Sequence, residues 1–252
     1  MPIKVANRSG VLVPTYYDGR FNEQIKSLLS KKGLTGKSIG QLESDGVIMV
    51  RGGHGSPGND QRAGSIPYIK VSDIRALRVN VNPTNLVTES VARRFWRGDE
   101  SGLKAWDLIT PNRASSNIGE FAIILPGEER IVVTKEVFIF RVIDDEIYDP
   151  FFLLWALSLQ AVREQWRRIA LMQTNREDCG GRYREIVLPA PPHKHWAQEI
   201  SRPFRDYFTT LAGAREKFCE AISGDDFPLV ASAMSLIPQD MQSGDEEEGT
   251  EE

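Results

Sequence analysis

The sequence contains little cysteine, little histidine and no long apolar run. Only two of its 252 residues are cysteines, Cys179 and Cys219, and only three are histidines. Two cysteines are too few for the disulfide framework of a small secreted domain, so we expect reduced thiols. No apolar run approaches the roughly 20 residues that cross a bilayer, and residues 1–10 lack the apolar stretch of a secretory signal. These absences predict a cytoplasmic protein without a membrane partner.

Familiar catalytic and metal-binding motifs are also missing. The histidines do not combine with either cysteine at a spacing typical of zinc sites. Gly36-Lys37-Ser38 resembles the end of a phosphate-binding loop, but Lys31 occupies the position where that motif requires its first glycine. Asp149–Phe152 resembles the Asp-Pro-Pro-Tyr type of loop of amino-methyltransferases, yet it lacks the second proline, and no glycine-rich cofactor turn lies upstream. We therefore predict no catalytic residues, no bound metal and no cofactor in this chain.

Acidic residues outnumber basic ones, but they are unevenly distributed. The chain has 31 Lys and Arg against 35 Asp and Glu, a net charge of −4. Residues 240–252 hold seven of these acids and no Lys or Arg, so residues 1–239 carry 31 basic against 28 acidic groups, a net charge of +3. A mildly basic body permits DNA binding without demanding it. We expect the acidic tail to be disordered and solubilising, with DNA mimicry or partner binding as the alternative.

Hydrophobic periodicity predicts an α+β fold, with a mixed β-rich domain and peripheral helices followed by a long helical spacer. Ser38 and Thr88 are typical helix caps, and Gly33 is a typical helix stop. The expected helices cover 20–30, a short stretch after Ser38, 88–96, 149–171 and 195–222, the last with a kink at Pro203. The expected strands cover 47–50, 66–71, 106–110, 121–125, 130–134, 137–142 and 184–188. The predicted units are a domain over 1–192, a spacer helix over 193–223 and a C-terminal extension over 224–252.

Three segments resemble a known family. Gly64–Ile74 reads GSIPYIKVSDI and follows the glycine-rich Arg51–Gly58. Leu103–Ile124 contains an Asp-Leu-Ile-Thr run that ends at a polar loop and resumes at Ile-Gly. Gln173–Ile200 contains a Pro-Ala-Pro-Pro turn before a helical segment. In this order and spacing, they resemble the specificity subunits of type I restriction-modification systems and the related target-recognition domains of N6-adenine DNA methyltransferases.

The resemblance implies a sequence-specific DNA-binding subunit that is not itself an enzyme. It would direct a partner adenine methyltransferase, and a restriction or other anti-phage effector where one exists, to a site on double-stranded DNA. S-adenosylmethionine would then be bound by the partner. Typical specificity subunits carry two such units, whereas this chain has room for one, so a homodimer through the spacer helix is a further expectation. His193–Trp196 departs from the family's glutamine-rich spacer opening, which puts the details of partner docking in doubt.

Two other interpretations stay open at this stage. The chain could be a detached C-terminal portion of a methyltransferase or nuclease with its own activity, or a structural subunit of a defence complex without DNA contacts. A neighbouring methyltransferase gene would favour the specificity subunit, and turnover by the isolated chain would favour the enzyme.

Polar loops supply the candidate DNA contacts. Arginine matches the major-groove edge of guanine, and asparagine or glutamine matches adenine, while lysine and arginine also contact phosphates without reading sequence. The predicted DNA-binding residues are Arg51, His54, Lys70, Ser72, Arg75, Lys104, Asn112, Arg113, Ser115, Asn117, Thr174, Asn175, Arg176 and Arg182.

Structural roles compete with these assignments. Arg113 and Arg176 could be solvated loop charges, and Lys70 could pair with Asp73. The three tryptophans nearest the helical segments are expected to pack in the core or at an interface rather than stack on bases. They are Trp155, Trp166 and Trp196.

Overall fold

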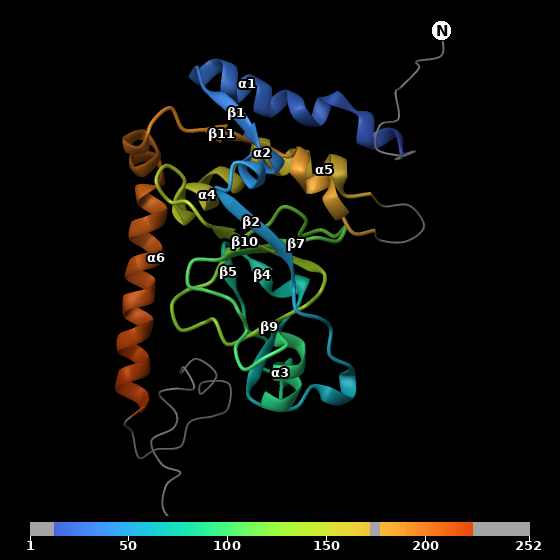
Figure 1. Cartoon of the computed structure of the whole chain (residues 1–252), viewed down its shortest axis with the longest axis vertical. Coiled ribbons are helices and arrows are strands. Elements are labelled where there is room, and N and C mark those ends of the chain that lie inside the picture. The colour runs from blue at the N-terminus through green and yellow to red at the C-terminus, as the bar shows by residue number, and fades with distance from the viewer. Residues whose placement is uncertain (1–12, 172–176, 224–252) are drawn as a thin grey trace, which may run out of the picture.

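The computed structural model describes residues 13–171 and 177–223, which contain both helices and strands, with most strands in the middle of the chain and a long helix at its end (Figure 1). This mixture confirms the predicted α+β class. The α-helices are α1 (Glu23–Lys32), α2 (Ile39–Ser44), α3 (Glu89–Trp96), α4 (Pro150–Leu157), α5 (Gln160–Ile169) and α6 (Lys194–Ser223). The strands are β1 (Thr35–Ser38), β2 (Ile48–Gly52), β3 (Ile66–Ile69), β4 (Ile74–Arg75), β5 (Arg78–Val79), β6 (Leu86–Val87), β7 (Leu108–Pro111), β8 (Ala122–Ile123), β9 (Val132–Val133), β10 (Val137–Val142) and β11 (Val187–Ala190).

A four-stranded antiparallel sheet, in the order β2-β10-β7-β8, divides the interior into two cores. Successive side chains of a strand point to opposite faces of a sheet. In β10, Phe138 and Phe140 therefore contact one cluster of apolar residues, whereas Val137 and Ile139 contact another. The sheet is therefore packed on both faces, which gives the loops at its ends a firm support.

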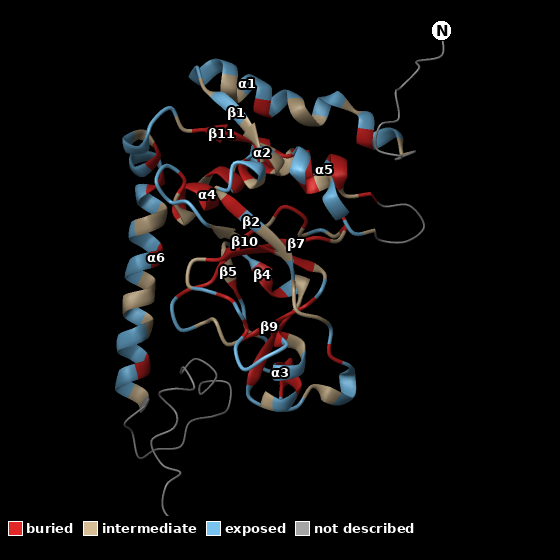
Figure 2. Cartoon of the chain, viewed as in Figure 1, coloured by how far each residue is buried: buried red, intermediate tan, exposed pale blue. Residues whose placement is uncertain are grey.

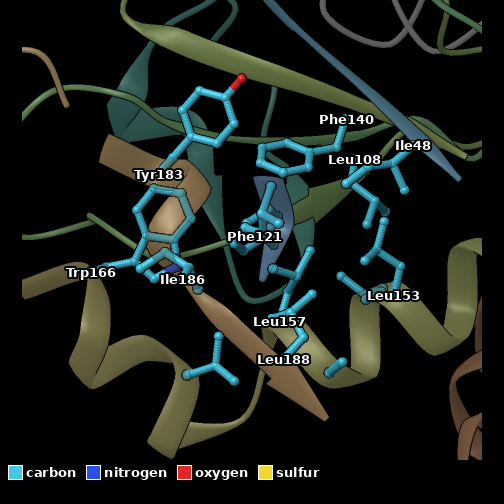
Figure 3. Close-up of a cluster of buried hydrophobic side chains, with 14 of the residues drawn as sticks. Ile48, Leu108, Phe121, Phe140, Leu153, Leu157, Trp166, Tyr183, Ile186 and Leu188 are labelled. Atoms are coloured by element: carbon cyan, nitrogen blue, oxygen red, sulfur yellow. The ribbon is translucent and has the colours of Figure 1, made fainter. Parts of the chain in front are cut away.

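The larger core lies on the helical side of this sheet (Figure 3). The rings of Phe121 and Phe140 have centroids 5.5 Å apart, and those of Phe121 and Trp166 lie 5.9 Å apart. Leu153 and Leu157 from α4 complete the contact, and both are fully buried. Trp166 has no exposed surface, which confirms its predicted packing role.

The smaller side of the molecule contains a three-stranded sheet in the order β6-β3-β9 and helix α3. β3 runs parallel to β9, with Tyr68 opposite Val132, whereas β6 is antiparallel to β3. Trp96 at the end of α3 is buried and donates its indole N–H to the Ile131 carbonyl, 2.9 Å away. Thr88 caps α3 by accepting a hydrogen bond from the Val91 amide, as its sequence predicted.

A short antiparallel ladder between β1 and β11 joins the segment after α1 to the segment before α6. Thr35 lies opposite Ala190 and Ser38 opposite Val187. Ser38 also forms a capping box with Gln41 at the start of α2, which confirms the predicted cap. Gly33 ends α1 in the left-handed conformation, with φ +63°, as expected for a helix stop.

Several predicted boundaries are wrong. The expected single helix over 149–171 is two helices, because Leu159 is extended and Ser158 returns its hydroxyl to the Leu154 carbonyl. The strand expected from residue 106 begins at Leu108, since Trp106 has φ +71°, which a strand does not allow. The strand expected over 184–188 is shifted to β11, because a 3-10 segment, η5 (Gly180–Glu185), precedes it.

Helix α6 runs along one side of the body, with most of its surface exposed or half-buried (Figure 2). Its existence matches the predicted spacer helix, and Pro203 lies inside it without ending it. Two arginines hold it to the domain. Arg205 donates to the carboxylate of Asp149, 2.5 Å away, and Arg215 donates to the carbonyls of Pro126 and Gly127. No helix among the described residues is long and apolar enough to span a membrane.

Candidate nucleic-acid interface

Three loops meet at one edge of the sheets because of how the strands are paired. β3 and β9 are parallel, so their carboxyl ends lie at the same edge. Val137, which begins β10, pairs with Pro111, which ends β7. The loops over 70–75, 112–117 and 134–136 are therefore neighbours, although they are far apart in the sequence.

Asn117 joins the first two of these loops directly. Its side-chain amide donates to the carbonyl of Val71 at 3.2 Å and to that of Ile74 at 3.4 Å. Ser72 and Arg75, two of the predicted DNA contacts, are exposed on the turn that Asn117 holds. The Arg75 guanidinium donates through Nε to the Ser72 carbonyl at 2.9 Å, which keeps its Nη atoms at the surface.

Arg113 links the polar loop to the segment over 177–182. Its guanidinium forms an ion pair with Glu136, and Nε lies 3.9 Å from the carboxylate of Asp178. The Arg113 side chain is 38% exposed, so it is neither buried nor a freely solvated loop charge. Arg182, another predicted contact, donates to the Asp178 carbonyl at 2.8 Å. The predicted contacts Thr174, Asn175 and Arg176 lie outside the described residues.

Asn112 is a scaffold residue in this arrangement. Only 7% of its surface is exposed, and its side-chain amide donates to the Lys135 carbonyl at 3.0 Å. Its backbone carbonyl also accepts from the Cys179 amide at 2.6 Å. Burial leaves Asn112 no accessible surface for a base edge, whereas Ser115 and Asn117 in the same loop are half-buried.

The side chains of Arg51 and His54 contact the carbonyls of Gly102 and Ser101 rather than the 112–117 loop. Arg51 donates to the Gly102 carbonyl at 2.8 Å, and burial together with nearby Arg141 lowers the pKa of Arg51. Arg141 contacts the same carbonyl and also binds the buried carboxylate of Asp107 through two hydrogen bonds. Lys104 is exposed next to them. The predicted residues therefore form two groups rather than one.

His54 uses both ring nitrogens inside the protein. Nε2 lies 2.8 Å from the Ser101 carbonyl, and Nδ1 accepts the Val133 amide at 2.9 Å. This pair of partners selects the neutral tautomer with the proton on Nε2. Burial lowers the pKa of His54 to about 4, a shift that the Ser101 carbonyl opposes and Arg51 reinforces. No nitrogen of His54 is left for a base in this conformation.

Lys70 does not pair with Asp73, so that alternative is wrong. Its ammonium donates to the side chain of Asn85 at 2.7 Å and lies 5.9 Å from the centroid of the Tyr68 ring. Asp73 instead accepts the backbone amide of Lys70 at 2.8 Å. The carboxylate thus shapes the turn and leaves the lysine half-exposed at the edge.

Two arginines that were not among the predicted contacts also border this edge. Arg163 and Arg167 lie on α5 beside the polar loop, with side chains 38% and 65% exposed. In the sequence, the cluster of arginines near the end of the helix expected over 149–171 could have indicated them. Lys135 is a further exposed cation, on the loop between β9 and β10. Among residues 13–171 and 177–223 there is no group of three His, Cys, Asp or Glu side chains placed to hold a metal.

No family model matches this chain, and no curated protein matches it. Solved structures similar to this chain are S subunits of type I restriction-modification systems.

The identities to these structures are low. The S subunit from M. genitalium is 11% identical over 90% of this chain and 51% of that chain, with a TM-score of 0.43. The HsdS subunit from Thermoanaerobacter tengcongensis is 11% identical over 83% of this chain and 43% of that chain, with a TM-score of 0.42. A chain from a structure of a type I R-M system is 13% identical over 92% of this chain and 54% of that chain, with a TM-score of 0.44. The protein spans about half the length of these chains.

Proposed function

We propose that this protein is a sequence-specific DNA-binding specificity subunit without catalytic activity of its own. The observation that carries the proposal is the convergence of the loops over 70–75, 112–117 and 177–182 at one edge of a packed scaffold. These loops come from the three segments that carry the sequence resemblance. A rigid platform with donor-rich loops is what reading of base edges requires.

The accessible side chains at this edge have the appropriate chemistry. Arg113 offers a planar guanidinium of the type that binds the O6 and N7 of guanine in a bidentate manner. Its ion pair with Glu136 is partly exposed, so exchange of the carboxylate for a base edge carries a small cost. Arg75 and Lys70 would contact phosphates, which would fix the register of the duplex.

Methyl transfer would take place in a partner. S-adenosylmethionine would be bound by an N6-adenine DNA methyltransferase subunit, which this chain would direct to its site. Helix α6 supports such docking because Ile200, Tyr207 and Phe218 are exposed at spacings that return to nearly the same side of a helix. The partner methyltransferase or a second copy of this chain would cover that stripe.

Selection from randomised duplex DNA tests the proposal. The full chain, with and without a partner methyltransferase, is incubated with the library, and the retained fraction is sequenced. We expect one short sequence motif, and an affinity that falls steeply with salt, by a log–log slope of about −0.9 per phosphate contact.

Two results would contradict the proposal. Retained DNA without any motif, at every salt concentration and with the partner present, would remove the claim of specificity. Methylation or cleavage of DNA by the isolated chain would instead identify it as an enzyme.

A further inference from the structure

A polar cleft lies between the 112–117 loop and helix α5. Its volume is about 410 Å³, and Ser115 and Ser116 line one wall while Arg163 and Arg167 line the other. α5 packs against the body on the same side as the end of β7 (Figure 1). The cleft therefore opens next to the loop that carries Arg113 and Asn117.

The walls of the cleft are held at a fixed distance by Gly119. This residue has φ +77°, and a Cβ built on it would lie 3.0 Å from Cδ1 of Trp166 and 3.2 Å from Cγ of Arg163. Trp166 is fully buried in the core, so α5 cannot move away without disturbing its packing. The cleft is thus part of the rigid scaffold.

The lining favours an anion. Arg163 and Arg167 provide two guanidinium groups, Glu164 is the one carboxylate in the lining, and Glu120 reaches Arg163 from outside it. Ser115 and Ser116 line the same cleft. The Ser115 hydroxyl oxygen is buried and has no hydrogen-bond partner among the described residues. A buried hydroxyl without a partner is costly, and a phosphate oxygen would accept from it.

Both arginines are engaged by carboxylates that a phosphate could replace. Arg163 lies 2.7 Å from Glu120, and Arg167 lies 3.1 Å from Glu164 on the next turn of the same helix. The Arg side chains are 38% and 65% exposed, and ion pairs at such positions contribute little to stability. A phosphodiester would therefore compete with Glu120 and Glu164 for these two guanidinium groups.

We infer that this cleft binds a backbone phosphate of the DNA, beside the bases read by the 112–117 loop. Arg163 and Arg167 would contact the phosphate oxygens, and the two serine hydroxyls would donate to them. This inference rests on the proposed function and adds a positioning site to it. It predicts an effect on affinity that is the same for every sequence, because phosphates carry no sequence information.

The test compares a double variant, Arg163→Ala with Arg167→Ala, with a matched double variant, Arg20→Ala with Arg93→Ala. Arg20 and Arg93 are also exposed, ion-paired arginines, and they lie on other elements, so the net charge changes equally. Binding is measured on the selected site and on unrelated duplexes across a salt series. We expect the cleft variant to lose about tenfold in affinity on all duplexes and to reduce the salt slope by about 1 to 2, beyond the matched variant.

A loss of affinity could also come from misfolding of the variant, so a second variant that should gain affinity is tested. Glu164→Gln keeps a polar group for Gln160, whose amide donates to Glu164 at 2.7 Å, but it removes the competing charge. We expect tighter binding on all duplexes, with Glu199→Gln on α6 as the matched control.

The outcomes separate the two proposals. A wild-type chain that selects a motif while the cleft variant matches the Arg20/Arg93 control in affinity and slope would overturn the cleft alone. A loss confined to certain bases would also overturn it, since the arginines would then read sequence. A wild-type chain without any motif would overturn the proposed function, whatever the cleft variants do.

Discussion

The side-chain amide of Asn117 donates a hydrogen bond to the backbone carbonyl of Val71, 3.2 Å away. The two residues are 46 positions apart, and this contact joins the polar loop after β7 to the turn after β3. Because one side chain holds both loops, their relative position is already set in the free protein. Preorganisation of this kind lowers the entropy cost of binding.

Asn117→Ala should uncouple the two loops. We expect a loss of about 1 kcal/mol in the free energy of unfolding, the usual value for a partly buried hydrogen bond, measured by urea denaturation. Binding to the selected DNA site should weaken more than binding to unrelated duplexes, because a base contact tolerates a shift of the loops less well than a phosphate contact from the 70–75 turn does. Equal binding to the selected site by variant and wild type would show that the loops do not need this link.

Arg113→Ala should relax the preference at one or two base pairs. A bidentate contact with guanine discriminates by about 1 to 3 kcal/mol, so the selected motif should lose information at those positions and keep it elsewhere. The measurement is repeated selection followed by competition with single-base variants of the site. Glu136→Gln is the complementary change, since it removes the carboxylate that holds Arg113 and should raise affinity. A uniform loss on every sequence would make Arg113 a phosphate contact instead.

Local features of the fold were predictable from the sequence because they depend on neighbouring residues. Ser38 and Thr88 cap their helices with hydrogen bonds to amides three residues later, and Gly33 supplies a conformation that few residues adopt. The break at Ser158–Leu159 was missed because apolar residues continue across it and no proline or glycine marks it in the sequence.

The site was harder to predict because its side chains have partners that are far away in the sequence. The polar loops were identified, but not which residues in them are accessible. His54 is held by Ser101 and Val133, which are 47 and 79 positions away, and nothing in the glycine-rich segment indicates either partner. Arg113 forms an ion pair with Glu136, which is 23 positions away in the sequence. Partners of this kind depend on strand pairing, which a single sequence does not specify.

Phe140→Ala should be among the most destabilising single changes. Phe140 is fully buried and packs against Phe121, with ring centroids 5.5 Å apart, so truncation leaves a cavity under the central sheet. We expect a loss of about 3 to 5 kcal/mol in the free energy of unfolding, measured by urea denaturation. Phe218→Ala on α6 is the control, because Phe218 is 50% exposed and should change stability by less than about 0.5 kcal/mol in the isolated chain. Similar losses for both variants would mean that α6 is covered in solution.

His54 should make the stability of the protein depend on pH below neutrality. Its pKa is about 4 in the folded protein and 6.5 in the unfolded chain. Between these values the unfolded state binds a proton that the folded state does not, so the free energy of unfolding must fall as the pH drops from about 6.5 to 4. The full contribution is present above pH 6.5 and amounts to at most about 3 kcal/mol.

His54→Gln removes this titration and should flatten the dependence over the same range, whereas His195→Gln, at an exposed position on α6, should leave it unchanged. Urea denaturation at pH 7.5, 6 and 5 measures the difference between the curves. Parallel curves for wild type and His54→Gln would show that folding does not shift the pKa of His54, so that the imidazole is protonated in the folded state at pH 5. The hydrogen bond from the Val133 amide to Nδ1 would then be absent in solution, because a protonated ring has no acceptor nitrogen.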